Sequence, residues 1–397
     1  MLRIKLQFAL TYMVLGGIAP LLAVFLKGEK GFSNAEVGQL FSLASLGLIL
    51  SPAVVTLLAD TRFDSRRILG FSLFASAALF STLQFTGPIW STTLLYTIYS
   101  IVYMPVIPLL DGYYFSVRHE RLEAGGSMPP YHQIRLWGTV GFVIPSLVFL
   151  VLLADFSMGK LFVPACVAFS LTGAISAFFL PPPPASAIAG NGKTKSRIPT
   201  TAAIRELFSP KGRLFCTALA IVAFALPVYY AFFPVYLEEN LKVEKRYIAI
   251  IGAIGPVIEV FWIMALGWLR SKIRLKGIMI LGLATMALRL LLLGTMESVT
   301  LAILVQVLHG AEILATIIVP VMYIDRLAGD RFRNSIQGVF LMLVIGVPRL
   351  IGGWVAGFLA ETRGVLDTFF YGSALAFLAL LLITLFFKPV PSQENLH

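Results

Sequence analysis

The chain alternates between long apolar runs and short polar segments. Twelve of the runs are close to the roughly 20 residues that an α-helix needs to cross a bilayer core of about 30 Å. Backbone groups in lipid must form their hydrogen bonds within their own segment, so each run is predicted to be a helix. The expected spans are residues 6–26, 36–59, 68–87, 92–116, 134–154, 160–180, 213–237, 247–269, 276–295, 298–323, 336–360 and 367–388.

Pro181–Gly212 is the longest polar interruption, and it opens with four prolines. Its Gly, Ser, Lys and Arg content is typical of a linker, and it divides the spans six and six. We therefore predict an all-α membrane protein with two pseudo-symmetric six-helix bundles. Residues 1–180 form the first bundle, residues 181–212 a cytoplasmic linker, and residues 213–397 the second bundle.

Composition agrees with a lipid-covered protein, because 58% of the residues are hydrophobic and only 13% are charged. A soluble domain is usually about half apolar and about one-quarter charged. The net charge of +11 does not indicate nucleic-acid binding, because the basic residues form short clusters between apolar runs instead of a stripe. The first run follows Arg3 and Lys5 without a clear cleavage site, so we interpret it as a span and not as a signal peptide.

The basic residues also predict the orientation. With the N-terminus in the cytoplasm, 22 Lys and Arg residues face that side, 7 face the other side, and Arg289 and Arg349 lie inside apolar runs. Positive charges favour the cytoplasmic side, so we expect both termini in the cytoplasm and an even number of spans. The predicted location is the cell inner membrane.

Several ionisable side chains lie deep inside the expected spans. In the second bundle, Glu259, Arg289, His309 and Glu312 lie about 15–20 Å from a helix end, near the midplane. The i,i+3 spacing places His309 and Glu312 on one helix face. A charge at the bilayer centre costs about 2.5–3.5 kcal/mol, so this set predicts a proton relay and a polar substrate site. Ion pairs that only hold helices together are the alternative.

The first bundle adds Asp111, late in span four, and Arg135, at the start of span five. The linked six-helix halves resemble the major facilitator superfamily. The segment Ala59–Arg67 resembles its signature loop between spans two and three, with Asp64 where Gly is usual. In that fold the halves are parallel repeats, and the substrate binds between them.

More specifically, the charged positions resemble those of the lactose permease and the oligosaccharide:proton symporters. The similar features are Arg289 followed by His309-x-x-Glu312, the span-eight acid Glu259, Pro108-x-x-Asp111, and Arg135-x-Trp137-Gly138-x-x-Gly141-Phe142. The resemblance implies that Glu312 carries the proton and that Arg289 and His309 couple it to the solute.

The same resemblance implies the substrate contacts. Glu259 would bind substrate hydroxyls, Asp111 and Arg135 would hold the other face as a charge pair, and Phe142 would stack on the solute. Tyr229 or Tyr230 would supply the family's span-seven Tyr. A carboxyl group in a dry apolar pocket favours its protonated form, so Glu312 is expected to hold a proton until the pocket becomes wet.

Three positions depart from the family pattern. Gln306 replaces a span-ten Lys, Trp262 replaces a polar sugar contact one turn after Glu259, and Arg349 has no acid on span seven to pair with it. We therefore expect Trp262 to contribute to a more apolar substrate pocket. Arg349 either binds an anionic substrate or has a structural role.

We therefore predict proton-coupled symport of a small polar solute, a sugar or sugar-like molecule, by alternating access. The alternatives are a nucleoside or aromatic-acid symporter and a proton-driven drug or metabolite exporter of the same fold. We expect no enzyme activity, because the sequence has no metal cluster, nucleophile–base pair or phosphate loop. We also expect no cofactor besides the coupling proton, no nucleic-acid partner, and a monomer in the bilayer.

Overall fold

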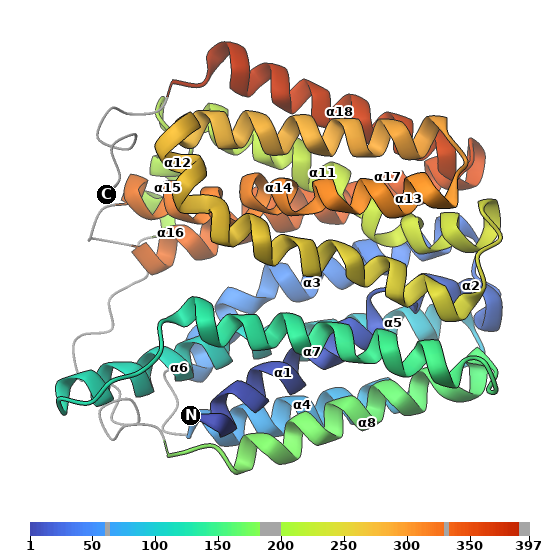
Figure 1. Ribbon diagram of the computed structural model, residues 1–397, viewed down its shortest axis with the longest axis horizontal. Coiled ribbons are helices and arrows are strands. Elements are labelled where there is room, and N and C mark those ends of the chain that lie inside the picture. The colour runs from blue at the N-terminus through green and yellow to red at the C-terminus, as the bar shows by residue number, and fades with distance from the viewer. Residues whose placement is uncertain (60–63, 183–199, 329–332, 389–397) are drawn as a thin grey trace. The chain divides into compact units, whose positions relative to one another are not determined.

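The computed structural model describes residues 1–59, 64–182, 200–328 and 333–388. Within these ranges every regular element is a helix (Figure 1). The helices are α1 Leu2–Ile18, α2 Leu22–Lys30, α3 Asn34–Ala59, α4 Ser65–Thr82, α5 Ile89–Tyr103, α6 Val106–Glu123, α7 Tyr131–Leu152, α8 Met158–Phe178, α10 Thr200–Leu207, α11 Arg213–Val235, η1 Tyr236–Asn240, α12 Lys245–Thr295, α13 Val299–Leu304, η2 Val305–Leu308, α14 His309–Ile313, η3 Leu314–Ile318, α15 Val319–Ala328, α16 Arg333–Val339, η4 Phe340–Gly346, α17 Val347–Thr362 and α18 Val365–Phe386.

These helices account for the twelve expected spans. Among the described residues, nine helical stretches are long and apolar enough to cross a membrane, and the pair α1 and α2, bent by 42°, makes a tenth. The 51-residue α12 contains two spans, because Arg274 has a non-helical backbone (φ 55°, ψ −178°) between them. α4 is the twelfth, with Arg66 and Arg67 in its first turn.

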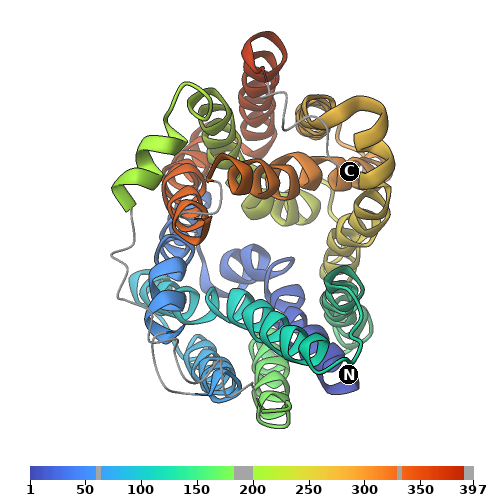
Figure 2. The same cartoon turned by 90° about the vertical axis from the view of Figure 1, so that its left-hand side faces the viewer.

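The chain forms two compact units. The first comprises Met1–Gly31, Leu46–Lys195 and Lys245–Ala253, and the second comprises Phe32–Ser45, Ser196–Glu244 and Ile254–His397. The boundary therefore falls inside α3 and α12, whose first parts group with helices of the other half of the sequence. Within each unit the long helices run side by side, and Figure 2 shows them nearly end-on.

Glycines allow close helix crossings in the first unit, where α1 packs on α7. A Cβ on Gly141 would lie 1.9 Å from the Ala9 carbonyl oxygen, and one on Gly16 would lie 2.1 Å from the Phe142 carbonyl oxygen. Neither position can hold a side chain without moving a backbone. This crossing sets the position of α7, which carries Arg135 and Phe142.

The second unit has similar crossings. A Cβ on Gly352 of α17 would lie 2.0 Å from the Phe224 carbonyl oxygen of α11. The first part of α3 also packs on α17, because a Cβ on Gly38 would lie 2.3 Å from the Gly357 Cα. At its start, the backbone N–H of Asn34 donates to the Glu361 carboxylate at 2.8 Å. An acid at a helix N-terminus is favourable, so this contact helps to hold α3 on α17.

The signature-like loop is described only from Asp64 onward, and its residues 60–63 lie outside the described part of the chain. Asp64 caps α4 by accepting from the Arg66 N–H at 2.9 Å and forms an ion pair with the Arg66 guanidinium. Burial opposes the charge of Asp64, but these hydrogen bonds keep its pKa below the usual value. The Asp at this position therefore has a structural role.

The expected linker is only partly described, since its residues 183–199 lie outside the described ranges. Its last part contains a short helix, α10, which packs on α15 and α16 with Ala203 and Leu207 fully buried. The tract 181–212 is therefore not a uniform linker. The division into bundles at 1–180 and 213–397 stays a prediction.

The Gly352 crossing generates a stability prediction. Gly352→Ala should destabilise the protein by about 1–3 kcal/mol, because the added methyl group overlaps a backbone carbonyl. Gly267→Ala is the matched control, since Gly267 is also helical and nothing lies within 4 Å of its added Cβ. The control should be neutral or stabilising by up to about 1 kcal/mol through helix propensity. Thermal unfolding in detergent measures both, and equal melting temperatures would contradict the packing argument.

Candidate functional site

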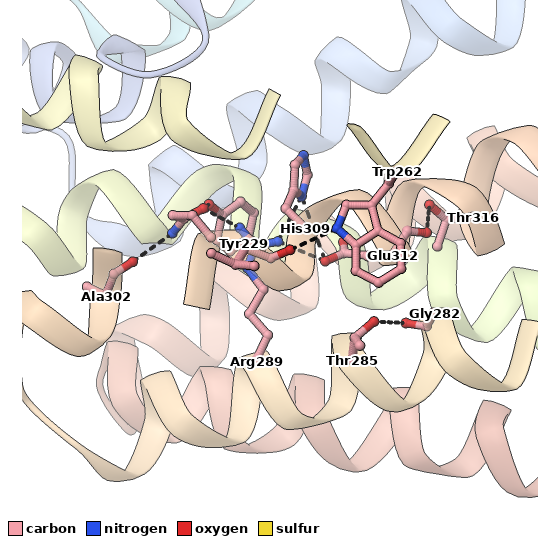
Figure 3. A network of polar contacts seen from close by, with 11 residues as sticks. Tyr229, Trp262, Gly282, Thr285, Arg289, Ala302, His309, Glu312 and Thr316 are labelled. Carbon is pink, nitrogen blue, oxygen red and sulfur yellow. Dashed lines mark hydrogen bonds and ion pairs between the residues drawn. The ribbon is translucent and has the colours of Figure 1, made fainter. Parts of the chain in front are cut away.

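The candidate site is a buried polar network centred on Arg289 of α12, which is 1% exposed. Its Nη1 donates to His309 Nδ1 at 2.9 Å and to Glu312 Oε2 at 2.8 Å. Figure 3 shows these residues together with their dashed contacts. The structure thus brings together the three residues that the sequence assigned to proton coupling, and the coupling role itself stays a prediction.

The geometry assigns the tautomer of His309. A guanidinium has only N–H donors, so His309 Nδ1 must accept from Arg289 and cannot carry a proton. The proton of the neutral imidazole is therefore on Nε2. His309 Nδ1 lies 3.9 Å from Glu312 Oε2, beyond hydrogen-bond distance. Arg289 consequently links the histidine to the glutamate.

Gln306 is a second centre of the network. Its Oε1 accepts from Arg289 Nη2 at 2.7 Å and from the Tyr229 hydroxyl at 2.9 Å, while its Nε2 donates to the Ala302 carbonyl at 2.9 Å. The sequence presented Gln306 only as the replacement of a family Lys. A buried guanidinium has five N–H donors and needs several acceptors. This requirement could have indicated that Gln306 binds Arg289.

Tyr229 also places its ring under the guanidinium, with Arg289 Cζ 3.7 Å from the ring centroid. A desolvated cation on an aromatic face gains up to about 2 kcal/mol, which offsets part of the cost of burying Arg289. Of the two span-seven tyrosines that the sequence offered, Tyr229 is the one hydrogen-bonded into the network. Glu312 is 2% exposed, so its pairing with Arg289 occurs away from water.

The helix that carries His309 and Glu312 is irregular. The 3₁₀ turn η2 ends at Leu308, directly before His309, and the π-turn η3 begins at Leu314, soon after Glu312. Such turns often mark hinges or functional positions, because they change the direction of side chains on a helix. The sequence predicted a regular span here and could not show these two changes of pitch.

Two glycines provide space for the rings. A Cβ on Gly255 would lie 2.8 Å from His309 Cδ2, and one on Gly310 would lie 2.2 Å from Trp262 Cδ1. Trp262 donates through Nε1 to the Val307 carbonyl at 3.1 Å, which fixes its indole beside the network. Glu259 is partly buried on α12, one turn before Trp262. The second unit therefore presents a fixed aromatic ring and a carboxylate on one helix.

In the first unit, Asp111 and Arg135 each have a tyrosine partner. Tyr131 donates its hydroxyl hydrogen to Asp111 Oδ1 at 2.8 Å, and Arg135 Cζ lies 3.9 Å from the Tyr12 ring centroid. Gly138 leaves room for this stacking, since its Cβ would lie 2.7 Å from Arg135 Nη1. Each of the two side chains thus contacts a tyrosine, and the charge of Arg135 also acts on the Asp111 carboxylate. Their role as a substrate-binding charge pair stays a prediction.

Phe142, which was expected to stack on the solute, is partly exposed on α7 directly after the Gly141 crossing. Arg349 lies in the middle of the span Ile336–Thr362, and its Cζ is 5.3 Å from the Tyr230 ring centroid. No carboxylate of the described residues lies within 4 Å of its guanidinium. Arg289 and Arg349, both within spans of the second unit, therefore differ in their pairing.

The hydrogen bonds of Gln306 predict how its replacement, including by the lysine found in the family, changes the stability of the protein. Gln306→Leu should destabilise the protein by about 1–3 kcal/mol, because Arg289 and Tyr229 lose an acceptor. Gln306→Lys should cost about 3–5 kcal/mol, since it also places a second cation against Arg289. Thermal unfolding of both purified variants separates the two effects. A lysine variant as stable as the leucine variant would contradict a charged Arg289 at this site.

The chain is similar in sequence to several transporters of Escherichia coli. It is 27% identical over 351 residues to the "Putative nucleoside transporter YegT" of Escherichia coli K12, covering 84% of this chain and 78% of the relative. It is 22% identical over 374 residues to the nucleoside permease NupG of the same organism, covering 91% and 88%. It is also 21% identical to the Escherichia coli xanthosine permease, covering 97% and 94%.

Solved structures show the same fold. A crystal structure of the nucleoside transporter NupG superposes with a TM-score of 0.84 at 18% identity and covers 98% of this chain and 99% of that one. The twelve spans are thus those of the major facilitator fold. A model of the MFS_1 like family matches residues 1–371. The chain therefore belongs to the MFS_1 like family of the major facilitator superfamily, and it is a multi-pass membrane transporter and not an enzyme.

Proposed function

We propose that this protein is a proton-coupled symporter that takes up nucleosides across the cell inner membrane by alternating access. The observation that carries the proposal is the buried ion pair between Arg289 and Glu312, which His309 and Gln306 share through the same guanidinium. Ionisable groups inside a membrane span are costly, and proton relays are a common reason for their presence. The proton is the only cofactor proposed, both termini face the cytoplasm, and the transporter works as a monomer.

The coupling rests on competition for Arg289. When Glu312 is ionised, its carboxylate and His309 Nδ1 both accept from Arg289 Nη1. Protonation of Glu312 removes the anion and weakens that contact, which frees the guanidinium to shift toward other acceptors. Solute and proton then bind cooperatively, because each favours the state without the ion pair. Release of the proton restores the pair between Arg289 and Glu312.

The polar and aromatic groups of each unit suit a ribosylated base. Carboxylates such as Glu259 and Asp111 accept hydrogen bonds from sugar hydroxyls. Trp262 has its indole fixed by Val307, and a fixed aromatic ring can stack on a base. Phe142 and Arg135 add an aromatic and a cationic group in the first unit. These groups support a solute with both a sugar and an aromatic part.

A sugar is the second candidate solute. The chain is 31% identical to the maltose permease of Geobacillus stearothermophilus, but over 147 residues that cover only 35% of this chain. The relatives named for nucleosides match it over most of its length. Nucleosides are therefore the first choice.

Uptake into proteoliposomes tests the proposal directly. With an inward pH gradient, the purified protein should accumulate labelled nucleosides well above the external concentration, and a protonophore should abolish the accumulation. Maltose and lactose serve as the competing solutes. Accumulation of either sugar without nucleoside uptake would refute the nucleoside assignment. Nucleoside accumulation that is the same with and without the pH gradient would refute proton coupling.

Glu312→Gln tests the coupling residue. This variant keeps the size and polarity of the side chain but cannot release a proton, so nucleoside exchange should persist while uphill accumulation falls to near equilibrium. Glu297→Gln removes a carboxylate from an exposed position before α13 and should leave both activities unchanged. Proton-driven accumulation by Glu312→Gln at the unmodified protein's level would assign the coupling to another group.

A further inference from the structure

Two neighbouring tyrosines of α11 each lie against an arginine in the second unit. Arg289 Cζ is 3.7 Å from the Tyr229 ring centroid, and Arg349 Cζ is 5.3 Å from that of Tyr230. The two tyrosine rings meet edge to face, with centroids 5.5 Å apart and planes at 79°. The tyrosine pair therefore connects Arg349 with the buried network around Arg289.

The two guanidiniums differ in how their donors are used. Arg289 donates to His309, Glu312 and Gln306, and it is almost fully buried. Arg349 is partly exposed, and its recorded contact is with the face of an aromatic ring, which accepts no in-plane N–H bond. Within the described residues no carboxylate lies within 4 Å of it. Arg289 leaves its buried Nε without a hydrogen-bond partner, but its Nη atoms all point to acceptors of the network, whereas the in-plane donor edge of Arg349 has no carboxylate beside it among the described residues.

Arg349 lies too deep in its span for its guanidinium to reach the membrane surface by snorkelling. The residue lies at the middle of the span Ile336–Thr362, and snorkelling places Lys and Arg heads at the interface only when they stand near helix ends. Pro348, the π-turn η4 and the start of α17 surround it, so its backbone is at a change of helical pitch. Such a position suits a side chain that contacts a transported molecule.

We infer that Arg349 is a specificity-determining residue that binds the acceptor edge of a 6-oxopurine base, and this inference rests on the proposed nucleoside transport. A guanidinium presents two parallel N–H donors, and the oxo oxygen and N7 of a 6-oxopurine present two adjacent acceptors at matching spacing. A 6-aminopurine places an amino donor where the oxo acceptor would be. Arg349 should therefore favour inosine and guanosine over adenosine.

Tyr230 has a positioning role in this arrangement. Its ring holds the guanidinium by a cation–π contact, and this contact needs the aromatic face and not the hydroxyl group. Tyr230→Phe should therefore retain the preference between bases. Tyr230→Leu should reduce it, because the guanidinium loses the surface that orients it.

The test is competition between inosine and adenosine, which have the same ribose and differ in the oxo or amino group at position 6 and in the hydrogen on N1. Proteoliposomes containing the full chain are given labelled inosine, and unlabelled inosine or adenosine competes for uptake. We expect inosine to compete better than adenosine by roughly 10- to 100-fold, the discrimination typical of one bidentate pair. Arg349→Gln should lose or reverse this ratio, because an amide matches the donor–acceptor pattern of adenine.

Three results would overturn the inference. If the unmodified protein transports nucleosides without preferring inosine, Arg349 does not read the base. If Arg349→Gln keeps the ratio, the recognition lies elsewhere. If Arg349→Gln weakens both competitors equally while its melting temperature is unchanged, Arg349 serves coupling and not specificity. In all three cases nucleoside transport stands, whereas a folded protein that takes up no nucleoside refutes the proposed function itself.

Discussion

The burial of Arg289 inside the membrane region is the constraint on which the functional half of the structure depends. A guanidinium cannot lose its proton in a protein, so its charge must be stabilised where it stands. Glu312 supplies the countercharge, His309 and Gln306 supply neutral acceptors, and Tyr229 supplies an aromatic face. Each of these side chains is positioned so that it contacts the Arg289 guanidinium.

The close helix packing follows from the same requirement. Polar side chains can meet in the interior only if the helices that carry them approach closely, and glycines permit this at Gly255, Gly282 and Gly310. A Cβ on Gly282 would lie 2.4 Å from the Ala311 carbonyl oxygen, so α12 and α14 are in direct backbone contact one residue before Glu312. Small residues near the network therefore determine whether Arg289 can reach its acceptors.

Much of the architecture could be predicted from the sequence, because lipid imposes a simple rule on span length and composition. The twelve spans follow from apolar run length, and helical spacing places His309 and Glu312 on one helix face. Their grouping with Arg289 was predicted from its similar depth in the membrane and from the family resemblance. The role of Gln306 as an acceptor could not be predicted, because it depends on which side chains of neighbouring helices lie at the same depth in the membrane. Here these side chains are Arg289 and Tyr229. The tyrosine partners of Asp111 and Arg135 could not be predicted either, since the sequence does not show which tyrosine reaches each side chain.

The contrast between Arg289 and Arg349 shows how one residue type can have two roles in one bundle. Both lie within membrane spans, and both rest on a tyrosine of α11. Arg289 is paired with the Glu312 carboxylate, so its charge is balanced inside the protein. Arg349 rests on a ring that leaves its donor edge available, and we propose that the solute complements it. We propose that the transporter uses both kinds of group, the first to respond to the coupling ion and the second to bind the solute.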